Sequence, residues 1–254
     1  MNIKYHFKPA EMLNGLAPAD MGLDFTYVQR LELTGQTAVI ETGEQEVCLV
    51  VLEGEAGYET AGLAGAATRK DMLYVPRGTA LELAAAERAV LMRYGAPAHI
   101  DTEFVHLPFA RIDADPKRHA VYGSLDNNSQ RDVWHFIGDD FKASRLMMGM
   151  CRSKIGGWTS WPPHEHGDQR EEVYTYIDMG HGFGIQCVYE DMNKPLAVAL
   201  VTEGDLVSIP RGYHPNVGCP ASVISFIWCM VARTPGQRQF MDLRIQSIYG
   251  DRFL

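Results

Sequence analysis

The sequence predicts an all-β protein composed of two tandem β-barrels, each of the double-sheet jelly-roll kind. Three observations support this prediction. Short runs of β-branched and aromatic residues alternate with glycine and proline turns along the chain. Two pairs of similar segments recur in the same order, which indicates an internal duplication. The 254 residues, 46% of them hydrophobic, suffice for one large or two modest cores.

The two repeats are recognised from their strands and turns. Residues 46–54 (EVCLVVLEG) and 172–180 (EVYTYIDMG) both begin with Glu-Val and end with glycine. Residues 69–83 (RKDMLYVPRGTALEL) are similar to residues 202–216 (TEGDLVSIPRGYHPN), with an aspartate, a proline and a glycine at matching places. Proline fixes φ and glycine tolerates positive φ, so each Pro-Arg-Gly marks a tight turn at a strand end.

The boundary between the barrels is expected near residue 110. Residues 96–119 are rich in small, polar and proline residues, and no compelling amphipathic helix is evident in residues 104–118. We therefore assign residues 1–110 to a first barrel and residues 111–254 to a second barrel. Tandem jelly-roll barrels fit this spacing of strands and turns.

Charge and hydropathy limit the classes of partner. The net charge of -9 argues against a surface that collects nucleic-acid phosphates or anionic lipids. The apolar run at residues 221–232 is too short to span a bilayer, and the N-terminus lacks the apolar core of a signal peptide. We expect a soluble, cytoplasmic protein without a nucleic-acid or membrane partner. The five cysteines show no paired spacing and are expected to be free, buried thiols.

Three histidines of the second repeat are candidate metal ligands. His164 and His166 lie one residue apart, so in a strand their side chains point to the same face. His214 follows the Pro-Arg-Gly turn and is expected on a neighbouring strand. The alternative is that the histidine pair lies on a solvated turn and that His214 is a strand-end histidine without a ligand role.

A comparison of the repeats favours metal binding. Ala80 stands in the first repeat where His214 stands in the second, and no histidine lies shortly before Glu46. One repeat therefore has all the ligand types and the other lacks all three histidines, which is the pattern that loss of a metal site would leave. We expect the first barrel to be folded and metal-free, and the second barrel to hold the metal.

The carboxylate ligand is predicted to be Glu172. It matches Glu46 when the two Glu-Val segments are aligned, whereas Glu171 has no counterpart in that alignment. Three imidazoles and one carboxylate suit a transition metal better than calcium or magnesium. We expect one divalent transition metal per chain, zinc first, with manganese, iron or nickel as alternatives. A five- or six-coordinate metal would keep open positions for a substrate.

At these residues the chain resembles the cupin superfamily, and more closely the family that joins 5-deoxy-glucuronate isomerase with 5-keto-4-deoxyuronate isomerase. The stretches that carry the resemblance are NNSQRDVWHFI, WTSWPPHEH, EEVYTYIDM, GFGIQCVYED, GDLVSIPRGYHP and SFIWCMVA. GFGIQCVY and GDLVSIPRGYHP are more similar to the deoxyglucuronate enzyme of inositol breakdown, and MMGMC and SFIWCMVA to the ketouronate enzyme of pectin breakdown. The spacing around His166, Glu172 and His214 departs from the general cupin pattern, which leaves Glu171 as an alternative ligand.

The resemblance implies a metal-dependent aldose-ketose isomerase of an open-chain sugar acid. The expected reaction converts 5-deoxy-glucuronate into 2-deoxy-5-keto-gluconate, with 5-keto-4-deoxyuronate as the alternative substrate and an iron dioxygenase as the rival enzyme class. In such a reaction a metal stabilises an enediolate while a general base moves a proton between adjacent carbons. Glu171 is the candidate base if Glu172 binds the metal.

Four further residues are candidates for substrate binding. Arg170 and Arg211 flank the predicted ligands, and arginine is suited to a bidentate contact with the carboxylate of a uronic acid. Tyr174 and Tyr176 share the face of Glu172 and are expected to line the pocket. Solvated turns for the arginines and core packing for the tyrosines are the alternatives. A homo-oligomer is expected because exposed strand edges favour association.

Overall fold

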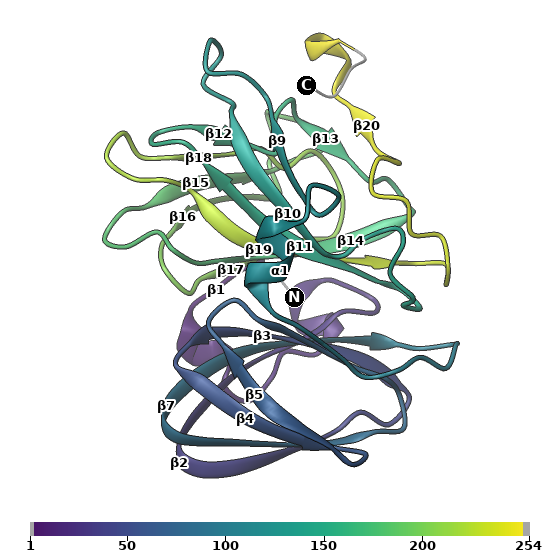
Figure 1. The fold of residues 1–254 in the computed structure, drawn as a ribbon. Helices are drawn as coiled ribbons and strands as arrows, with labels where there is room; N and C mark the ends of the chain where they lie inside the picture. The colour runs from purple at the N-terminus through teal and green to yellow at the C-terminus, as the bar shows by residue number, and fades with distance from the viewer. Residues whose placement is uncertain (1–2, 251–254) are drawn as a thin grey trace.

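The computed structural model describes residues 3–250, which form two β-barrels stacked on each other (Figure 1). The first barrel is one seven-stranded sheet with the order β5-β4-β7-β3-β6-β8, in which β2 also pairs with β7. This sheet curls around its own apolar core. Its strands are β2 (Tyr27–Glu41), β3 (Gln45–Glu53), β4 (Glu55–Thr60), β5 (Leu63–Thr68), β6 (Met72–Val75), β7 (Ala80–Pro97) and β8 (Val105–Leu107).

The second barrel is made of a seven-stranded sheet, β1-β17-β14-β19-β11-β10-β9, that packs on a four-stranded sheet, β12-β18-β15-β16. A small sheet of β13 and β20 adjoins them. The strands are β1 (His6–Phe7), β9 (His119–Tyr122), β10 (Arg131–Ile137), β11 (Leu146–Ser153), β12 (Trp158–Thr159), β13 (His164–Glu165), β14 (Arg170–Tyr176), β15 (Gly184–Val188), β16 (Ala197–Val201), β17 (Leu206–Ile209), β18 (Asn216–Gly218), β19 (Ser225–Ala232) and β20 (Arg244–Ile245).

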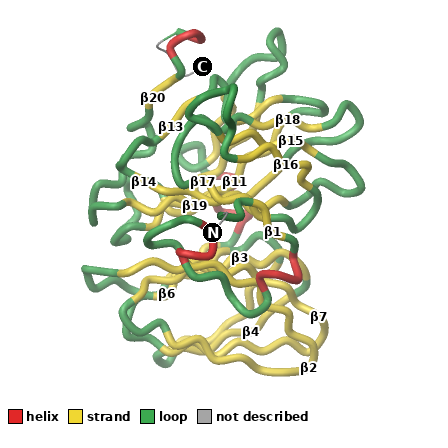
Figure 2. The backbone as a smooth tube through the Cα atoms, turned by 180° about the vertical axis from the view of Figure 1, so that it is seen from behind, coloured by secondary structure: helices red, strands yellow, loops and turns green. Residues whose placement is uncertain are grey.

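The all-β prediction is confirmed, and helices are few and short (Figure 2). They are η1 (Pro9–Met12), η2 (Pro18–Met21), α1 (Phe109–Ala114) and η3 (Ser247–Tyr249). Residue 110 lies within α1, in a stretch where the sequence indicates no helix. The first described strand also belongs to the second barrel, because β1 pairs with β17 before β2 enters the first barrel.

The burial of the cysteines agrees only in part with the prediction from the sequence. All five cysteines are free; three are buried, but Cys187 and Cys219 are partly exposed, contrary to expectation. Within residues 3–250, no helix has the length and apolar character needed to cross a membrane.

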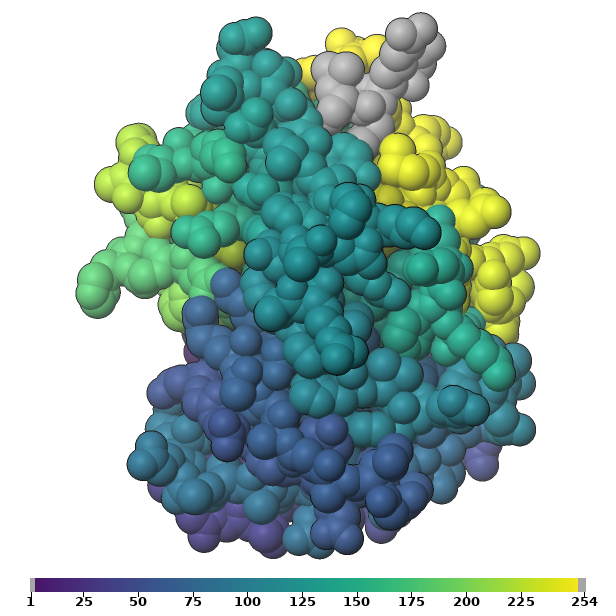
Figure 3. Space-filling view, in the orientation of Figure 1, coloured from purple at the N-terminus to yellow at the C-terminus, as the bar shows by residue number. Residues whose placement is uncertain are grey.

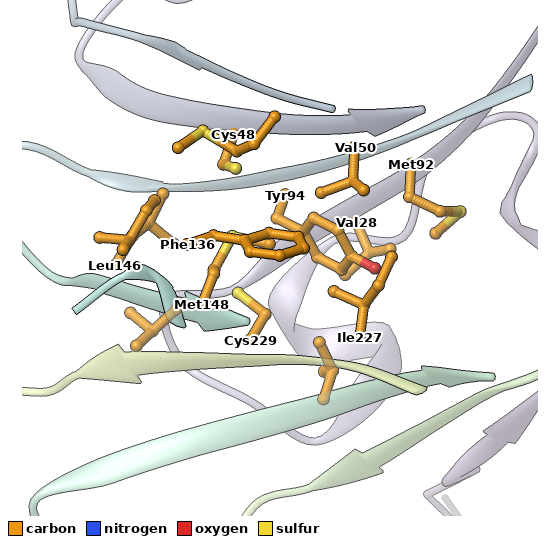
Figure 4. Close-up of a cluster of buried hydrophobic side chains, with 14 of the residues drawn as sticks. Val28, Cys48, Val50, Met92, Tyr94, Phe136, Leu146, Met148, Ile227 and Cys229 are labelled. Carbon is orange, nitrogen blue, oxygen red and sulfur yellow. The ribbon is translucent and has the colours of Figure 1, made fainter. Parts of the chain in front are cut away.

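Each barrel has an inner core, and a third core lies between the barrels (Figure 4). Strand alternation produces this arrangement, because successive side chains of β3 and β14 point to opposite faces. Cys48 and Val50 of β3 point to the shared core, as does Val173 of β14. Val47 of β3 and Tyr174 of β14 point instead into their own barrels. Both strands are therefore buried on both faces.

Strand pairing shows which residues of the two repeats are equivalent. In the first barrel, Val47 of β3 pairs with Val75 of β6. In the second, Glu172 of β14 pairs with Ile209 of β17. Val75 and Ile209 both precede a Pro-Arg-Gly turn, so they hold the same place. Glu172 therefore corresponds to Val47, and the glutamate before Val47 corresponds to Glu171.

The predicted match of Glu172 with Glu46 is thus wrong by one position, and the true counterpart of Glu46 is Glu171. Glu46 is fully buried between the barrels. Its carboxylate accepts hydrogen bonds from the backbone N–H groups of residues 144–146 at 2.7, 2.5 and 2.9 Å. The Tyr74 hydroxyl donates another at 2.6 Å. One carboxylate of the first barrel therefore holds a backbone segment of the second.

Glu171 makes the reciprocal set of contacts. Its buried carboxylate accepts hydrogen bonds from the backbone N–H groups of residues 24–26 at 2.8, 2.8 and 2.7 Å, and from the Thr26 hydroxyl at 2.7 Å. Residues 24–26 precede β2, as residues 144–146 lead into β11. Because β2 pairs with β7 as β11 pairs with β19, the two contacts are related by the duplication.

Replacing either carboxylate should weaken the joint between the barrels. Glu46→Gln and Glu171→Gln each replace one acceptor oxygen by an amide that faces backbone N–H donors. We expect each to lower the free energy of unfolding by about 2 kcal/mol, measured by urea denaturation. Glu44→Gln is the control, since that side chain is 92% exposed and its ion pair with Arg77 contributes little. Variants as stable as the wild-type protein would contradict this role.

Candidate metal centre

Short, adjacent elements bring the predicted ligands to one end of the second barrel. His164 lies on β13, and His166 lies in the turn that follows it. Glu172 lies on β14, with its side chain on the inner face of the sheet. His214 lies between β17 and β18, after the Pro-Arg-Gly turn whose Gly212 has φ of 88°. This positive φ is accessible to glycine at low cost, so the turn returns the chain toward the barrel interior.

The four side chains converge within ligand distance of one another. The histidine ligand atoms of His164, His166 and His214 all lie within 4.8 Å of each other. The Oε2 atom of Glu172 lies 3.4 Å from Nε2 of His166 and 3.3 Å from Nε2 of His214. All four residues are buried. Side chains that are far apart in sequence thus form one cluster.

Backbone carbonyls orient two of the imidazoles. Nδ1 of His164 lies 3.1 Å from the carbonyl oxygen of Pro162, and Nδ1 of His214 lies 2.9 Å from that of Gly212. When each Nδ1–H donates to its carbonyl, Nε2 is left as the lone-pair nitrogen. The same second contact of a ligating histidine is usual in metal sites.

The buried polar atoms of the cluster fit a metal ion. Nε2 of His214 and Oε2 of Glu172 have no hydrogen-bond partner among the described residues. Leaving such a buried atom without a partner costs about 1–3 kcal/mol. An ion bound by these atoms would remove that cost, and a set of three nitrogens and one oxygen suits a divalent transition metal.

Burial sets the charge of the cluster. It lowers the pKa of all three histidines, that of His166 to about 3, where the charge of Arg170 adds to the effect. Burial also raises the pKa of Glu172 to about 7, against the opposing influence of His214 and Arg170. The histidines are therefore neutral near pH 7, which is the form that binds metal.

A cavity adjoins the cluster. Aromatic and aliphatic side chains make up most of its wall. Its lining residues are Tyr122, Arg131, Val133, Cys151, Ser160, His164, His166, Glu172, Tyr174, Phe226, Trp228, Met230, Phe240 and Leu243. Phe240 and Leu243 belong to the C-terminal segment, which lies along the second barrel (Figure 3). β20 fixes this segment by pairing with β13, the strand that carries His164.

The other predicted site residues are placed outside this cavity, with one exception. Tyr174 lines it, and its hydroxyl lies 2.8 Å from Oγ of Ser160. Tyr176 shares the inner face but lies beyond the cavity, where its hydroxyl donates to Oε1 of Gln186 at 2.6 Å. Glu171 points to the opposite face of β14 and is engaged by residues 24–26. Its carboxylate is therefore not placed to act as a base in the cavity.

Neither predicted arginine lines the cavity. Arg211 is exposed and pairs with Glu190, with Nε 2.7 Å from the carboxylate oxygen. Arg170 is buried, and its guanidinium contacts the carbonyl oxygen of Asp242 and, at 3.9 Å, the sulfur atoms of Met147 and Met230. Arg170 is buried near Glu172, so its charge lowers the pKa of Glu172 although its side chain does not line the cavity.

Sequence reasoning missed Arg131, which does line the cavity. A signal for it was present. Arg131 and Val133 occupy alternating positions of β10, so both side chains point to the same face, and that face is the barrel interior. An arginine on an interior strand face is rare unless it has a partner or a ligand. Tyr122, which lies on β9 and pairs with Arg131 of β10, was not predicted from the sequence either.

The profile of the KduI/IolB family matches residues 4–248. The chain belongs to this family. Curated relatives include the 5-deoxy-glucuronate isomerases of Geobacillus kaustophilus, 29% identical over 79% of this chain and 77% of the relative, and of Bacillus subtilis, 28% identical over 80% of each. These relatives confirm the prediction that the chain is an isomerase enzyme.

Solved structures confirm the cupin fold of this KduI/IolB member. An IolB-like protein from Salmonella typhimurium superposes with a TM-score of 0.82, at 18% identity, over 97% of this chain and 98% of that protein. Oxalate decarboxylase from Bacillus subtilis superposes with a TM-score of 0.62, at 11% identity, over 91% of this chain and 76% of that protein. The prediction of two tandem cupin barrels agrees with both likenesses.

The metal content of variants should distinguish the role of Glu172 from that of Glu171. Glu172→Gln and His214→Ala are expected to lose most of the bound metal, because each removes one of the four converging ligand atoms. Glu171→Gln is the matched control and should keep full occupancy, since its carboxylate faces the other barrel. Elemental analysis of the purified, folded variants makes the comparison. Full occupancy in Glu172→Gln, or loss in Glu171→Gln alone, would exchange the two assignments.

Proton release on metal binding should reflect the charge of the empty cluster. At pH 6, below the pKa of about 7, Glu172 is mostly protonated, while the histidines are already neutral. Binding should therefore release about one proton and weaken as the pH falls below 7. Calorimetry of metal binding in buffers of different ionisation enthalpy measures this number. Release of two or three protons would show that the histidines are charged before binding.

Proposed function

We propose that the protein is a metal-dependent ketol isomerase that converts 5-deoxy-glucuronate into 2-deoxy-5-keto-gluconate. The observation that supports the proposal best is one cavity lined by Arg131, by the Glu172 carboxylate and by two imidazoles of the three-histidine cluster. The curated relatives carry the name of this isomerase. Their sequence identity to this chain is below one third, which is too low to fix the substrate. The ketouronate of pectin breakdown is therefore the alternative substrate.

The reaction moves hydrogen within one molecule. The C–H proton of the carbon that bears the hydroxyl is removed, and a proton is returned to the former aldehyde carbon. The hydroxyl proton passes between the two oxygens, so no oxidant or reductant is consumed. A divalent metal, for which we propose zinc, would be held by His164, His166, Glu172 and His214, and would act as a Lewis acid toward the two oxygens.

We propose that protein side chains orient the substrate and exclude bulk water from the cavity. The apolar wall formed by residues such as Phe226, Trp228 and Phe240 excludes bulk water, which strengthens electrostatic interactions in the cavity. Burial raises the pKa of Tyr174 well above its usual range, so its hydroxyl keeps its proton. We propose that Tyr174, held beside Ser160, donates a hydrogen bond to a substrate oxygen.

Substrate conversion tests the proposal directly. We expect the metal-loaded protein to convert 5-deoxy-glucuronate in deuterated water without oxygen, with deuterium found by NMR at the former aldehyde carbon. His214→Ala should lower this rate by at least about 100-fold, the usual scale for loss of electrostatic stabilisation at a reacting oxygen. Conversion of the ketouronate alone would change the substrate. Oxygen consumption with conversion of neither sugar acid would instead indicate a dioxygenase.

A further inference from the structure

We infer that Arg131 binds the carboxylate of the substrate and thereby fixes which end of the sugar acid meets the metal ligands. This inference deepens the proposed function and rests on it. A uronic acid is anionic at the end of its carbon chain opposite the reacting aldehyde. The cavity must therefore hold a carboxylate and an aldehyde at the same time, in one orientation.

Arg131 has the position that such a contact requires. It begins β10, is only 2% exposed, and lines the same cavity as His164, His166 and Glu172. Among the described residues of this lining, it is the one with a permanent positive charge. Its charge also acts on the cluster, since it is one of the causes that lower the pKa of His164.

Two backbone carbonyls fix the orientation of the guanidinium. Nη1 donates to the carbonyl oxygen of Ser129 at 2.9 Å, and Nη2 donates to that of Trp161 at 2.8 Å. These contacts come from two different loops, one before β10 and one between β12 and β13. A guanidinium held in this way loses little further freedom when it binds a ligand, which favours tight and specific binding.

Tyr122 completes the proposed subsite. It pairs with Arg131 across β9 and β10, and the guanidinium carbon lies 6.0 Å from the centre of its ring. Tyr122 also lines the cavity. A planar guanidinium next to an aromatic face, in a mostly apolar cavity, is suited to a planar anion such as a carboxylate.

The two arginines considered from the sequence are less suited to this role. Arg211 is exposed and paired with Glu190, and Arg170 contacts methionine sulfurs and a backbone carbonyl and does not line the cavity. Arg211 therefore provides the matched control: it is an arginine near the ligands in sequence whose loss should leave substrate binding unchanged.

The test compares 5-deoxy-glucuronate with its neutral amide, in which the carboxylate is replaced by a carboxamide. In the wild-type protein we expect kcat/KM for the acid to exceed that for the amide by about 10- to 100-fold, the scale of hydrogen bonds to a charged group. Arg131→Met should lose this preference through a raised KM for the acid while keeping its rate with the amide. Arg131→Lys should keep part of the preference, and Arg211→Met all of it.

Wild-type measurements keep the inference testable if the variants of this buried arginine fail to fold. Equal conversion of acid and amide by the wild-type protein would overturn it, as would an unchanged preference in folded, metal-loaded Arg131→Met. Failure of the proposed function gives a different result. If the wild-type protein converts neither compound, but calorimetry shows that it binds the acid and that Arg131→Met does not, the carboxylate subsite is supported and the isomerase proposal is refuted.

Discussion

Side chains alternate between the two faces of β14, and this alternation decides both how the barrels are joined and where the histidine–glutamate cluster forms. Adjacent residues of a strand point to opposite faces of the sheet, so Glu171 and Glu172 are committed to different environments. The carboxylate of Glu171 accepts hydrogen bonds from the backbone of residues 24–26 and so joins the two barrels. Glu172 faces the interior and meets the histidines. A shift of one residue in this strand would exchange the two carboxylates, which would disrupt both the joint between the barrels and the histidine–glutamate cluster.

Of the two glutamates of β14, only Glu171 has an equivalent glutamate in the first barrel, and this glutamate also joins the barrels. Glu46 binds residues 144–146 as Glu171 binds residues 24–26, so the duplicated carboxylate supports the joint from both sides. The position equivalent to Glu172 is Val47, which packs in the apolar core of the first barrel. The first barrel therefore supports the second by burying the other face of β14 in the shared core, which leaves the inner face for chemistry.

The fold class and the convergence of three histidines and one glutamate could be predicted from the sequence, because strand patterning and an internal repeat are visible there. Their role as metal ligands stays a prediction. Glu172 was reached through an alignment that was wrong by one position, since two Glu-Val pairs looked equivalent when only strand pairing could decide. The role of Glu171 was hidden because its partners lie far away in sequence. Arg131 was missed for a related reason: its place in the cavity depends on how β9, β10 and the C-terminal segment pack together, whereas closeness to the ligands in sequence favoured Arg170 and Arg211.

Anomalous diffraction from metal-loaded crystals can decide which glutamate of β14 binds the metal, because it locates the ion independently of activity. We expect one anomalous peak per chain, bonded to His164, His166, His214 and the carboxylate of Glu172, with the Glu171 carboxylate still hydrogen-bonded to residues 24–26. No peak should lie in the first barrel near Val47. A peak bonded to Glu171, or an ion held in the first barrel while the histidine cluster stays empty, would show that the two faces of β14 are assigned wrongly.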